Sequence, residues 1–236
     1  MMDETFFHVK LNSIEQNQFS LSKSESHHFI KSLRGVSGDN IWLLDGKGNA
    51  HHAEVKTIDN FIVKGRILDS FNNYGESQNN LCLALGLIKG KRMDLVIEKA
   101  VEFGVKSIQP LIFERSIRKS INIDRLNKII VASSKQSGRS FFPSLMEPKI
   151  LSDWMEVHHN ETSIVCHFSG NNINEVIDEK SSSINIIVGP EGDFSPNELT
   201  LFRDYNIPFV NLGPRRLRSE SACISAILHI NQITRA

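Results

Sequence analysis

A polar, asparagine-rich segment from Asp69 to Asn80, DSFNNYGESQNN, divides the chain into two parts with different hydrophobic patterns. Before it, short runs of alternating apolar and polar residues are typical of β-strands with one buried face. After it, continuous apolar runs alternate with stretches of helical spacing, which is typical of an α/β fold with a mostly parallel sheet. We therefore predict an N-terminal domain over residues 1–70, a linker over 71–80 and a second domain over 81–236.

The N-terminal part has the pattern of a small β domain. Strands are predicted over residues 40–44, 50–57 and 61–68, with glycine-containing turns between the first two. Ser22 and Glu25 have the spacing of a capping box, which predicts one helix before these strands.

The C-terminal part alternates strands with helices, as a parallel sheet requires. We predict strands over residues 81–87, 107–113, 162–167, 184–188 and 209–212. We predict helices around residues 93–101, over 124–137 and over 219–233.

The stretch VGPEGDFSPNEL links a predicted strand to a helix start. Ser195 is a suitable N-cap, Pro196 fits the first helical position and Glu198 completes a capping box. Gly189 to Phe194 is then a tight loop at the carboxyl end of a strand, where ligands bind in open α/β sheets. Taken alone, the stretch is equally consistent with an ordinary strand-to-helix turn.

A second strand-end loop lies in NLGPRRLRSESACISAIL, residues 211–228. Gly213-Pro214 turns the chain, three arginines follow at positions 215, 216 and 218, and Glu220 falls in the first turn of the next helix. If the two strands are neighbours, their loops form one pocket lined by backbone, suited to amides, hydroxyls and a purine edge. The arginines suit a partner that carries phosphate, although two ordinary loops with solvated arginines remain the alternative.

The distribution of charge is more informative than the formal net charge, which is zero. Residues 85–150 carry 13 Lys and Arg against 6 Asp and Glu, so a neutral chain can still present a basic face to a polyanion. The three cysteines form no CxxC pair and sit among apolar residues, as expected for free thiols in a reducing compartment. No leader pattern or membrane-spanning run is present, so we expect a soluble cytoplasmic protein.

The sequence lacks the motifs of several common classes of enzyme and metal-binding protein. The stretch GLIKGKR has the wrong spacing for a phosphate-binding P-loop and has Arg in place of the metal-binding Ser or Thr. No GxGxxG follows a strand, which argues against a dinucleotide-binding oxidoreductase, and there is no GxSxG elbow. The histidine pairs have no third ligand at metal-binding spacing, so we expect no metal site.

Five stretches together give a specific resemblance. VGPEGDFS, LGPRRLRSESA, KGKRMDLVIEKAVEFGV, KQSGRSFFP and HHFIKSLRGVSGDNIWLLDGKGN occur in the order found in RsmE-type 16S ribosomal RNA methyltransferases of the SPOUT class. The similarity covers nearly the whole chain. It implies an α/β SPOUT-type methyltransferase domain with a deep trefoil knot, preceded by a PUA-like β-barrel domain that binds RNA.

The resemblance also implies an activity. S-adenosylmethionine would be the cofactor, held in a bent shape by the knot loops. A homodimer with its site near the subunit interface would methylate N3 of one uridine of 16S rRNA, in the decoding region of the assembled small subunit. No metal and no membrane would take part.

The cofactor would be held mainly by backbone groups of the two strand-end loops and by two residues at the end of another strand. The predicted cofactor-binding residues are His167, Phe168, Val188, Gly189, Pro190, Glu191, Gly192, Leu212, Gly213, Arg215, Leu217 and Ser219.

Methylation at N3 requires that the uridine lose a proton that it largely keeps at neutral pH. Glu220 is a candidate base for that proton. Arg218 is a candidate for stabilising the charge that develops on the uracil carbonyl oxygens. Residue types alone do not choose between them, and Glu220 is equally well placed to serve only as a helix-end carboxylate.

RNA contacts are expected from the basic middle of the chain and from one residue of the N-terminal domain, while the target base is splayed out of its stack. The predicted RNA-binding residues are Arg34, Lys89, Lys91, Arg92, Arg115, Lys135 and Arg139.

The chain departs from the family pattern at several positions. Thr5 replaces a common arginine, Asp193 replaces the last glycine of GPEGG and Arg216 replaces an aliphatic residue. Ser219 and Ser221 replace threonines and keep the hydroxyl groups.

Two other functions remain open. One is a SPOUT methyltransferase that acts on another RNA position, since no residue in the sequence identifies which base is methylated. The other is a ribosome-assembly protein that binds RNA without catalysis, which the intact GPEG and Arg218-Ser219-Glu220 stretches argue against.

Overall fold

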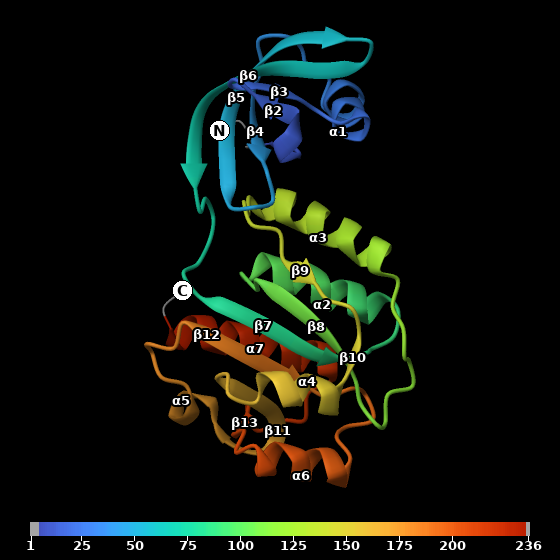
Figure 1. Cartoon of the computed structure of the whole chain (residues 1–236), viewed down its shortest axis with the longest axis vertical. Helices are drawn as coiled ribbons and strands as arrows, with labels where there is room; N and C mark the ends of the chain where they lie inside the picture. The colour runs from blue at the N-terminus through green and yellow to red at the C-terminus, as the bar shows by residue number, and fades with distance from the viewer. Residues whose placement is uncertain (1–4, 235–236) are drawn as a thin grey trace. The chain divides into compact units, whose positions relative to one another are not determined.

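The computed structural model describes residues 5–234, which form two compact units (Figure 1). One unit extends to Glu76 and also includes Val131–Phe142, and the other combines Ser77–Ile130 with the chain from Pro143 onward. The segment 131–142 is thus far from the rest of its unit in sequence.

The N-terminal unit is built on a six-stranded sheet. Its strands are β1 (Phe6–His8), β2 (Ile14–Glu15), β3 (Gln18–Ser20), β4 (Asn40–Leu44), β5 (Asn49–Asp59) and β6 (Ile62–Asn72). Their order is β1-β4-β5-β6-β3-β2, and β1 pairs with β4 in parallel while the other pairs are antiparallel. The three strands predicted from alternation are β4, β5 and β6, whereas the short strands β1 to β3 were not predicted.

Three short helical elements complete this unit: η1 (Leu11–Ser13), α1 (Lys23–His27) and η2 (His28–Ser32). The Ser22 side chain caps α1 by accepting a hydrogen bond from the Glu25 backbone at 3.2 Å, which confirms the predicted helix start.

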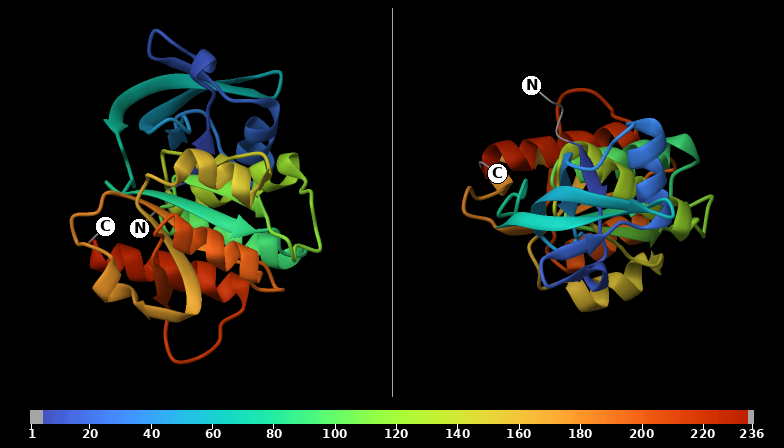
Figure 2. Two further views of the ribbon diagram at one scale, coloured as in Figure 1. Left: turned by 60° about the horizontal axis from the view of Figure 1, so that its bottom comes forward. Right: turned by 90° about the horizontal axis from the view of Figure 1, so that it is seen from above.

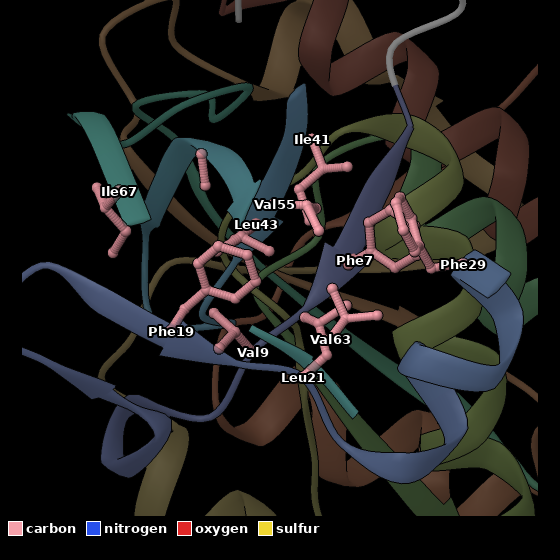
Figure 3. Packing of buried hydrophobic residues seen from close by; sticks show 11 residues of the cluster. Phe7, Val9, Phe19, Leu21, Phe29, Ile41, Leu43, Val55, Val63 and Ile67 are labelled. Carbon is pink, nitrogen blue, oxygen red and sulfur yellow. The ribbon is translucent and has the colours of Figure 1, made fainter. Parts of the chain in front are cut away.

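The core of the unit lies on one face of this sheet (Figure 3). Phe7 and Phe29 meet edge to face with ring centroids 5.8 Å apart, and Val55 and Val63 from the long hairpin point into the same cluster. A Cβ on Gly65 would lie 2.1 Å from the Glu54 carbonyl oxygen, so the close pairing of β5 and β6 requires glycine there.

A buried ion pair ties the segment 131–142 into this unit. The Arg139 guanidinium donates to both carboxylate oxygens of Glu76, at 2.8 and 3.2 Å, and Glu76 also accepts from the Phe141 backbone at 3.0 Å. The two side chains are 4% and 2% exposed. Arg139 was predicted to contact RNA, but its guanidinium is buried and already paired, so its side chain holds structure within this unit.

The C-terminal unit is built on a parallel sheet. Its strands are β7 (Asn80–Gly86), β8 (Ser107–Ile112), β9 (Ser144–Leu145), β10 (Lys149–Ile150), β11 (Ser163–Asn172), β12 (Ser183–Val188) and β13 (Phe209–Asn211). The order is β10-β8-β7-β12-β11-β13, with β9 paired to β8, and every pair is parallel. The predicted mostly parallel α/β sheet is confirmed.

Helices cover both faces of this sheet. They are α2 (Lys91–Glu102), α3 (Ile123–Ser137), α4 (Leu151–His158), α5 (Ile173–Val176), α6 (Pro196–Asp204) and α7 (Ser219–Ile233), and the last seven residues of α3 belong to the other unit. On one face α7 packs on β12, β7 and α2, and Figure 2 shows it in red along the sheet. On the other face Trp154 of α4 and Phe202 of α6 are buried in one cluster with Val165 and Ile187 of the sheet.

The predicted strands and helices of this unit are confirmed to within a few residues, but α4, α5, β9 and β10 were not predicted. Both missed strands have only two residues, too few to show a period. Within residues 5–234, no helix is long and apolar enough to cross a membrane.

The Arg139–Glu76 pair gives a stability prediction. Arg139→Ala leaves the Glu76 carboxylate buried without its cation, so we expect the free energy of unfolding to fall by about 3–5 kcal/mol. The measurement is urea unfolding followed by Trp42 fluorescence in a Trp154→Phe background, because Trp42 is the tryptophan of this unit.

Lys56→Ala is the control, since Lys56 pairs with Glu54 on the surface and its loss should change the free energy of unfolding little. An Arg139→Ala loss as small as that of the control would contradict the structural role assigned to Arg139.

Candidate functional site

Four parallel strands end at the same edge of the C-terminal sheet. Val188 of β12 is in register with Leu85 of β7 on one side and with Cys166 of β11 on the other, and Cys166 is in register with Val210 of β13. The loops that follow these strands therefore meet, as the sequence predicted for the segments after β12 and β13.

A cavity of about 540 Å³ lies between these loops. Its wall combines backbone of the two glycine-proline loops, apolar side chains and several charged groups. The lining residues are Arg92, Cys166, His167, Phe168, Val188, Gly189, Pro190, Glu191, Asp193, Phe194, Val210, Asn211, Leu212, Gly213, Arg215, Arg216, Leu217, Arg218, Ser219 and Ala222.

The loop from Gly189 to Phe194 crosses directly over the end of β7. A Cβ on Gly86 would lie 2.5 Å from the backbone nitrogen of Pro190 and 2.8 Å from its Cα, so only glycine allows this approach. The Phe194 ring then packs between Phe113 and Phe202, with centroid distances of 5.4 and 5.3 Å. The loop is thus held at both ends by contacts that its own sequence does not reveal.

Residues at the end of β8 fix the far side of the same loop. Ser195 and Glu198 form the predicted capping box at the start of α6. The second carboxylate oxygen of Glu198 accepts from the Glu114 backbone at 2.7 Å. Arg115 donates to the carbonyl oxygens of Gly192 and Phe194, at 3.3 and 3.1 Å.

Asp193 has a left-handed backbone with φ of 61°. This is the position where the family pattern has glycine, and aspartate is one of the few other residue types that adopt this conformation readily. Its carboxylate lies 3.6 Å from the Arg216 guanidinium of the other loop. Two departures from the family pattern thus face each other, although the pair is exposed and contributes little to stability.

A bulge in β11 carries His167 and Phe168 to the cavity. The pairing of β11 with β13 shifts between Cys166 and Asn171, which takes the intervening residues out of the ladder. The Asn211 side chain donates to the Phe168 carbonyl at 2.6 Å and holds the bulge against β13.

Two charged residues lie at the start of α7, and one of them, Arg218, lines the cavity. Arg218 occupies the N-cap position and Glu220 falls in the first turn. Glu220 is 12% exposed; one of its carboxylate oxygens lies 3.8 Å from the Arg92 guanidinium, and the other is buried with no hydrogen-bond partner among the described residues. Arg92 also pairs with Glu191 of the first loop at 3.2 Å.

Two cysteines close to this site have unreactive thiols. Burial raises the pKa of the Cys166 thiol to about 12, and it raises the pKa of Cys223 well above its usual value. Both thiols therefore stay protonated near neutral pH and are poor nucleophiles.

The structure brings together nearly all of the predicted cofactor-binding residues. Eleven of the twelve line the cavity, and the exception is Gly192, which packs against Arg115. Arg218 also lines the cavity, whereas Glu220 lies behind Arg92.

Sequence reasoning missed the other lining residues, above all Arg92, which was predicted as an RNA contact. Arg92 follows a lysine-rich turn in the sequence, and nothing in that stretch indicates that it pairs with Glu191 and Glu220 in the fold.

The predicted RNA-binding residues do not gather in one place. Lys89 and Lys91 are exposed on either side of Gly90, and Arg34 is exposed in the N-terminal unit. Lys135 is largely neutralised by Glu25 at 2.7 Å. Arg115 holds a loop, as described above. Within residues 5–234, no group of three or more His, Cys, Asp or Glu residues is placed to hold a metal ion.

Family models match both parts of the chain. The model of the RNA methyltransferase domain matches residues 75–231, and that of the RNA methyltransferase PUA domain matches residues 21–67. The predicted fold class, an α/β SPOUT-type domain with an N-terminal PUA-like domain, is confirmed.

Individual relatives are similar over almost their whole length. The ribosomal RNA small subunit methyltransferase E of Mesomycoplasma hyopneumoniae is 31% identical to this chain. The aligned region covers 91% of this chain and 94% of the relative. The protein of the same name from Buchnera aphidicola of Acyrthosiphon pisum is 29% identical, covering 92% and 88%. The crystal structure of such an enzyme from Neisseria gonorrhoeae, bound to S-adenosylmethionine, superposes with a TM-score of 0.89 at 29% identity over 98% of both chains.

Proposed function

This chain belongs to the RNA methyltransferase family, and from that premise we propose that it methylates N3 of a uridine in the 16S rRNA of the small ribosomal subunit. It is an rRNA methyltransferase with S-adenosylmethionine as its methyl donor. What we propose beyond this activity is the methylated base, a uridine, and the methylated atom, its N3. The single observation that carries the proton-transfer step is the buried, unpartnered carboxylate oxygen of Glu220, whose other oxygen faces Arg92 of the cavity wall.

The lining of the cavity fits S-adenosylmethionine. The backbone of residues 188–190 and 212–213 offers the amide and carbonyl groups that an adenine edge needs, and Val188, Leu212 and Leu217 offer apolar contacts for its ring. The two carboxylates of the wall, Glu191 and Asp193, are each paired with an arginine, so the fit rests on the backbone groups and the apolar contacts.

The chemistry is a methyl transfer to nitrogen. When bound, S-adenosylmethionine supplies the methyl group, whose bond to N3 forms as its bond to sulfur breaks and the sulfur keeps the electron pair. The protein must then hold the uracil in line and favour the loss of the N3 proton.

Glu220 is the residue that we assign as the base for the N3 proton. A buried carboxylate oxygen with no partner is costly, and a catalytic role is one explanation for such a group in a folded protein. Glu220 does not line the cavity and this oxygen is buried, so it can accept the N3 proton of a docked uridine only after a local rearrangement exposes it. Arg92, which faces the other carboxylate oxygen, would fix the orientation of the side chain.

Arg218 takes the complementary role. It lines the cavity, and no ion pair is recorded for it within residues 5–234, so its charge is available to the uracil carbonyl oxygens as they become negative. The two candidates that residue types left open therefore act together, with the carboxylate accepting the proton and the guanidinium stabilising the anion.

The partners follow from the substrate. We infer contact with 16S rRNA in the small subunit, and hence a cytoplasmic location, through the exposed cations of the C-terminal unit and through the PUA-like domain. We also infer a homodimer, supported by the exposed apolar side chains of Leu95 on α2 and Leu228 on α7, two helices that pack on each other.

The experiment uses small subunits from a strain that lacks its own enzyme. They are incubated with the protein and labelled S-adenosylmethionine, and the rRNA is digested to nucleosides for mass spectrometry. We expect a single 3-methyluridine. A different methylated nucleoside would favour another RNA position, and cofactor binding with no methylated nucleoside would favour a non-catalytic RNA-binding protein.

Gly86→Ala tests the cavity. The new Cβ meets backbone of Pro190, which cannot rotate away, so the loop must move and we expect the affinity for S-adenosylmethionine to fall by about tenfold or more. Gly189→Ala is the matched comparison: its Cβ meets the Phe194 ring at 3.1 Å, which can shift, so the loss should be smaller. Calorimetric titration measures both, and equal affinities for Gly86→Ala and the unchanged protein would contradict the placement of the cofactor.

Glu220→Gln tests the base. We expect turnover to fall by about 10²–10⁴-fold, the usual contribution of a general base, with little change in cofactor affinity. Glu175→Gln, an exposed carboxylate in the first turn of α5, is the control and should leave turnover unchanged. Single-turnover methylation of small subunits measures the effect; if both variants reacted at the same rate, Glu220 would have no role in the proton transfer.

A further inference from the structure

A second cavity of about 360 Å³ lies at the same edge of the C-terminal sheet. It opens between the loop that follows β7 and the loop that follows β8, two parallel strands paired through Gly86 and Leu111. Its lining residues are Ile88, Gly90, Met93, Arg118, Ser120, Ile121, Asn122, Arg125 and Leu126, none of which lines the first cavity.

The two loops around this cavity carry an excess of unpaired positive charge. Lys89 and Lys91 flank Gly90 on one side, and Arg118 and Lys119 precede Ser120 on the other. All four are exposed, and no hydrogen bond or ion pair is recorded for their side chains within residues 5–234. Arg118 lines the cavity itself, and the three lysines are next to lining residues in the sequence, so the two loops together attract a strand with negative charges along its length.

The acidic groups nearby do not cancel this charge. Asp94 is held by the Arg125 guanidinium, with a shortest distance of 2.5 Å, and Glu114 accepts from the Asn197 side chain at 3.1 Å on the side of α6. Asp124 is the remaining carboxylate, exposed in the first turn of α3. On these segments four unpaired cations therefore outnumber one unpaired carboxylate.

The wall of the cavity combines an apolar floor with polar groups. Ile88, Met93 and Leu126 are fully or almost fully buried. The Asn122 side-chain oxygen accepts from the Arg125 backbone at 2.9 Å, so its amide nitrogen is left to donate, and the Ser120 hydroxyl lies in the same wall. This combination fits a ribose on the floor and a phosphate at the charged rim better than it fits a free inorganic anion.

The first turn of α2 separates the two cavities. Gly90 and Met93 line the second cavity, whereas Arg92 lines the first and meets both Glu191 and Glu220. A nucleotide held in the second cavity therefore lies at the same turn of α2 as Arg92, which contacts the carboxylate that we assign as the base.

We infer that this second cavity binds a phosphodiester and ribose of the substrate RNA strand, next to the nucleotide that is methylated. The inference rests on the proposed function. Its role is to bring the backbone of the splayed strand to the first turn of α2, so that the neighbouring base reaches the first cavity.

The test measures RNA binding separately from methylation. A fluorescein-labelled, single-stranded 12-nucleotide RNA is titrated with the full chain across a range of salt concentrations, and anisotropy gives the affinity. We expect Arg118→Ala to weaken binding by about tenfold and to flatten the slope of log K against log salt by about 0.7, as for one lost phosphate contact. Ser120→Phe, which fills the cavity without removing charge, should also weaken binding.

Lys180→Ala is the matched control, since Lys180 is an exposed cation of the same unit on a turn after α5. It should leave both affinity and salt slope unchanged. Calorimetry with S-adenosylmethionine should give the same affinity for all three variants, which separates this cavity from the first.

Arg118→Ala and Ser120→Phe proteins that bind RNA as tightly as Lys180→Ala would overturn the inference. The RNA titration needs no turnover, so this outcome is distinct from a failure of the proposed function. In that case Arg118→Ala would still weaken RNA binding, but the unsubstituted protein would form no 3-methyluridine.

Discussion

The cofactor cavity depends on the close approach of one loop to the end of a neighbouring strand. Pro190 lies so near Gly86 that no side chain fits at position 86, and this contact brings the loop after β12 over the end of β7. The parallel register then places the ends of β11 and β13 beside it, so backbone from separate parts of the chain lines one cavity. Backbone groups are suited to this task because sheet register and loop packing hold them at fixed positions, whereas a long side chain would pay an entropic cost to become ordered.

The chemistry follows from where charge is left unpaired. Glu198, Asp94 and Glu76 each satisfy hydrogen-bond donors and hold structure together. Glu220 is different, because one of its oxygens is buried without a partner and the other faces Arg92. Arg92 joins the first loop, through Glu191, to the start of α7, through Glu220, and so links cofactor binding to the orientation of the proposed base.

Local signals in the sequence predicted local structure well. The capping box of Ser195 and Glu198 and the apolar runs of the buried strands depend on residues within a few positions, and both are present in the structure. The family resemblance then supplied the roles of the glycine-proline loops. What the sequence did not reveal are contacts between distant residues: Pro190 over Gly86, Glu198 with the Glu114 backbone, and Arg92 between two carboxylates. Arg139 is the clearest case, because QSGR has the composition of an exposed basic loop, while its partner Glu76 lies 63 positions away.

The most direct test of this account locates the cofactor. Uniformly ¹⁵N-labelled protein is titrated with S-adenosylmethionine, and the backbone amide shifts are followed by two-dimensional NMR. We predict that the largest shifts fall within residues 166–168, 188–194 and 210–219, which contain most of the residues that line the first cavity. Largest shifts around residues 88–91 and 118–126 or in the N-terminal unit, with the first-cavity amides unmoved, would contradict it.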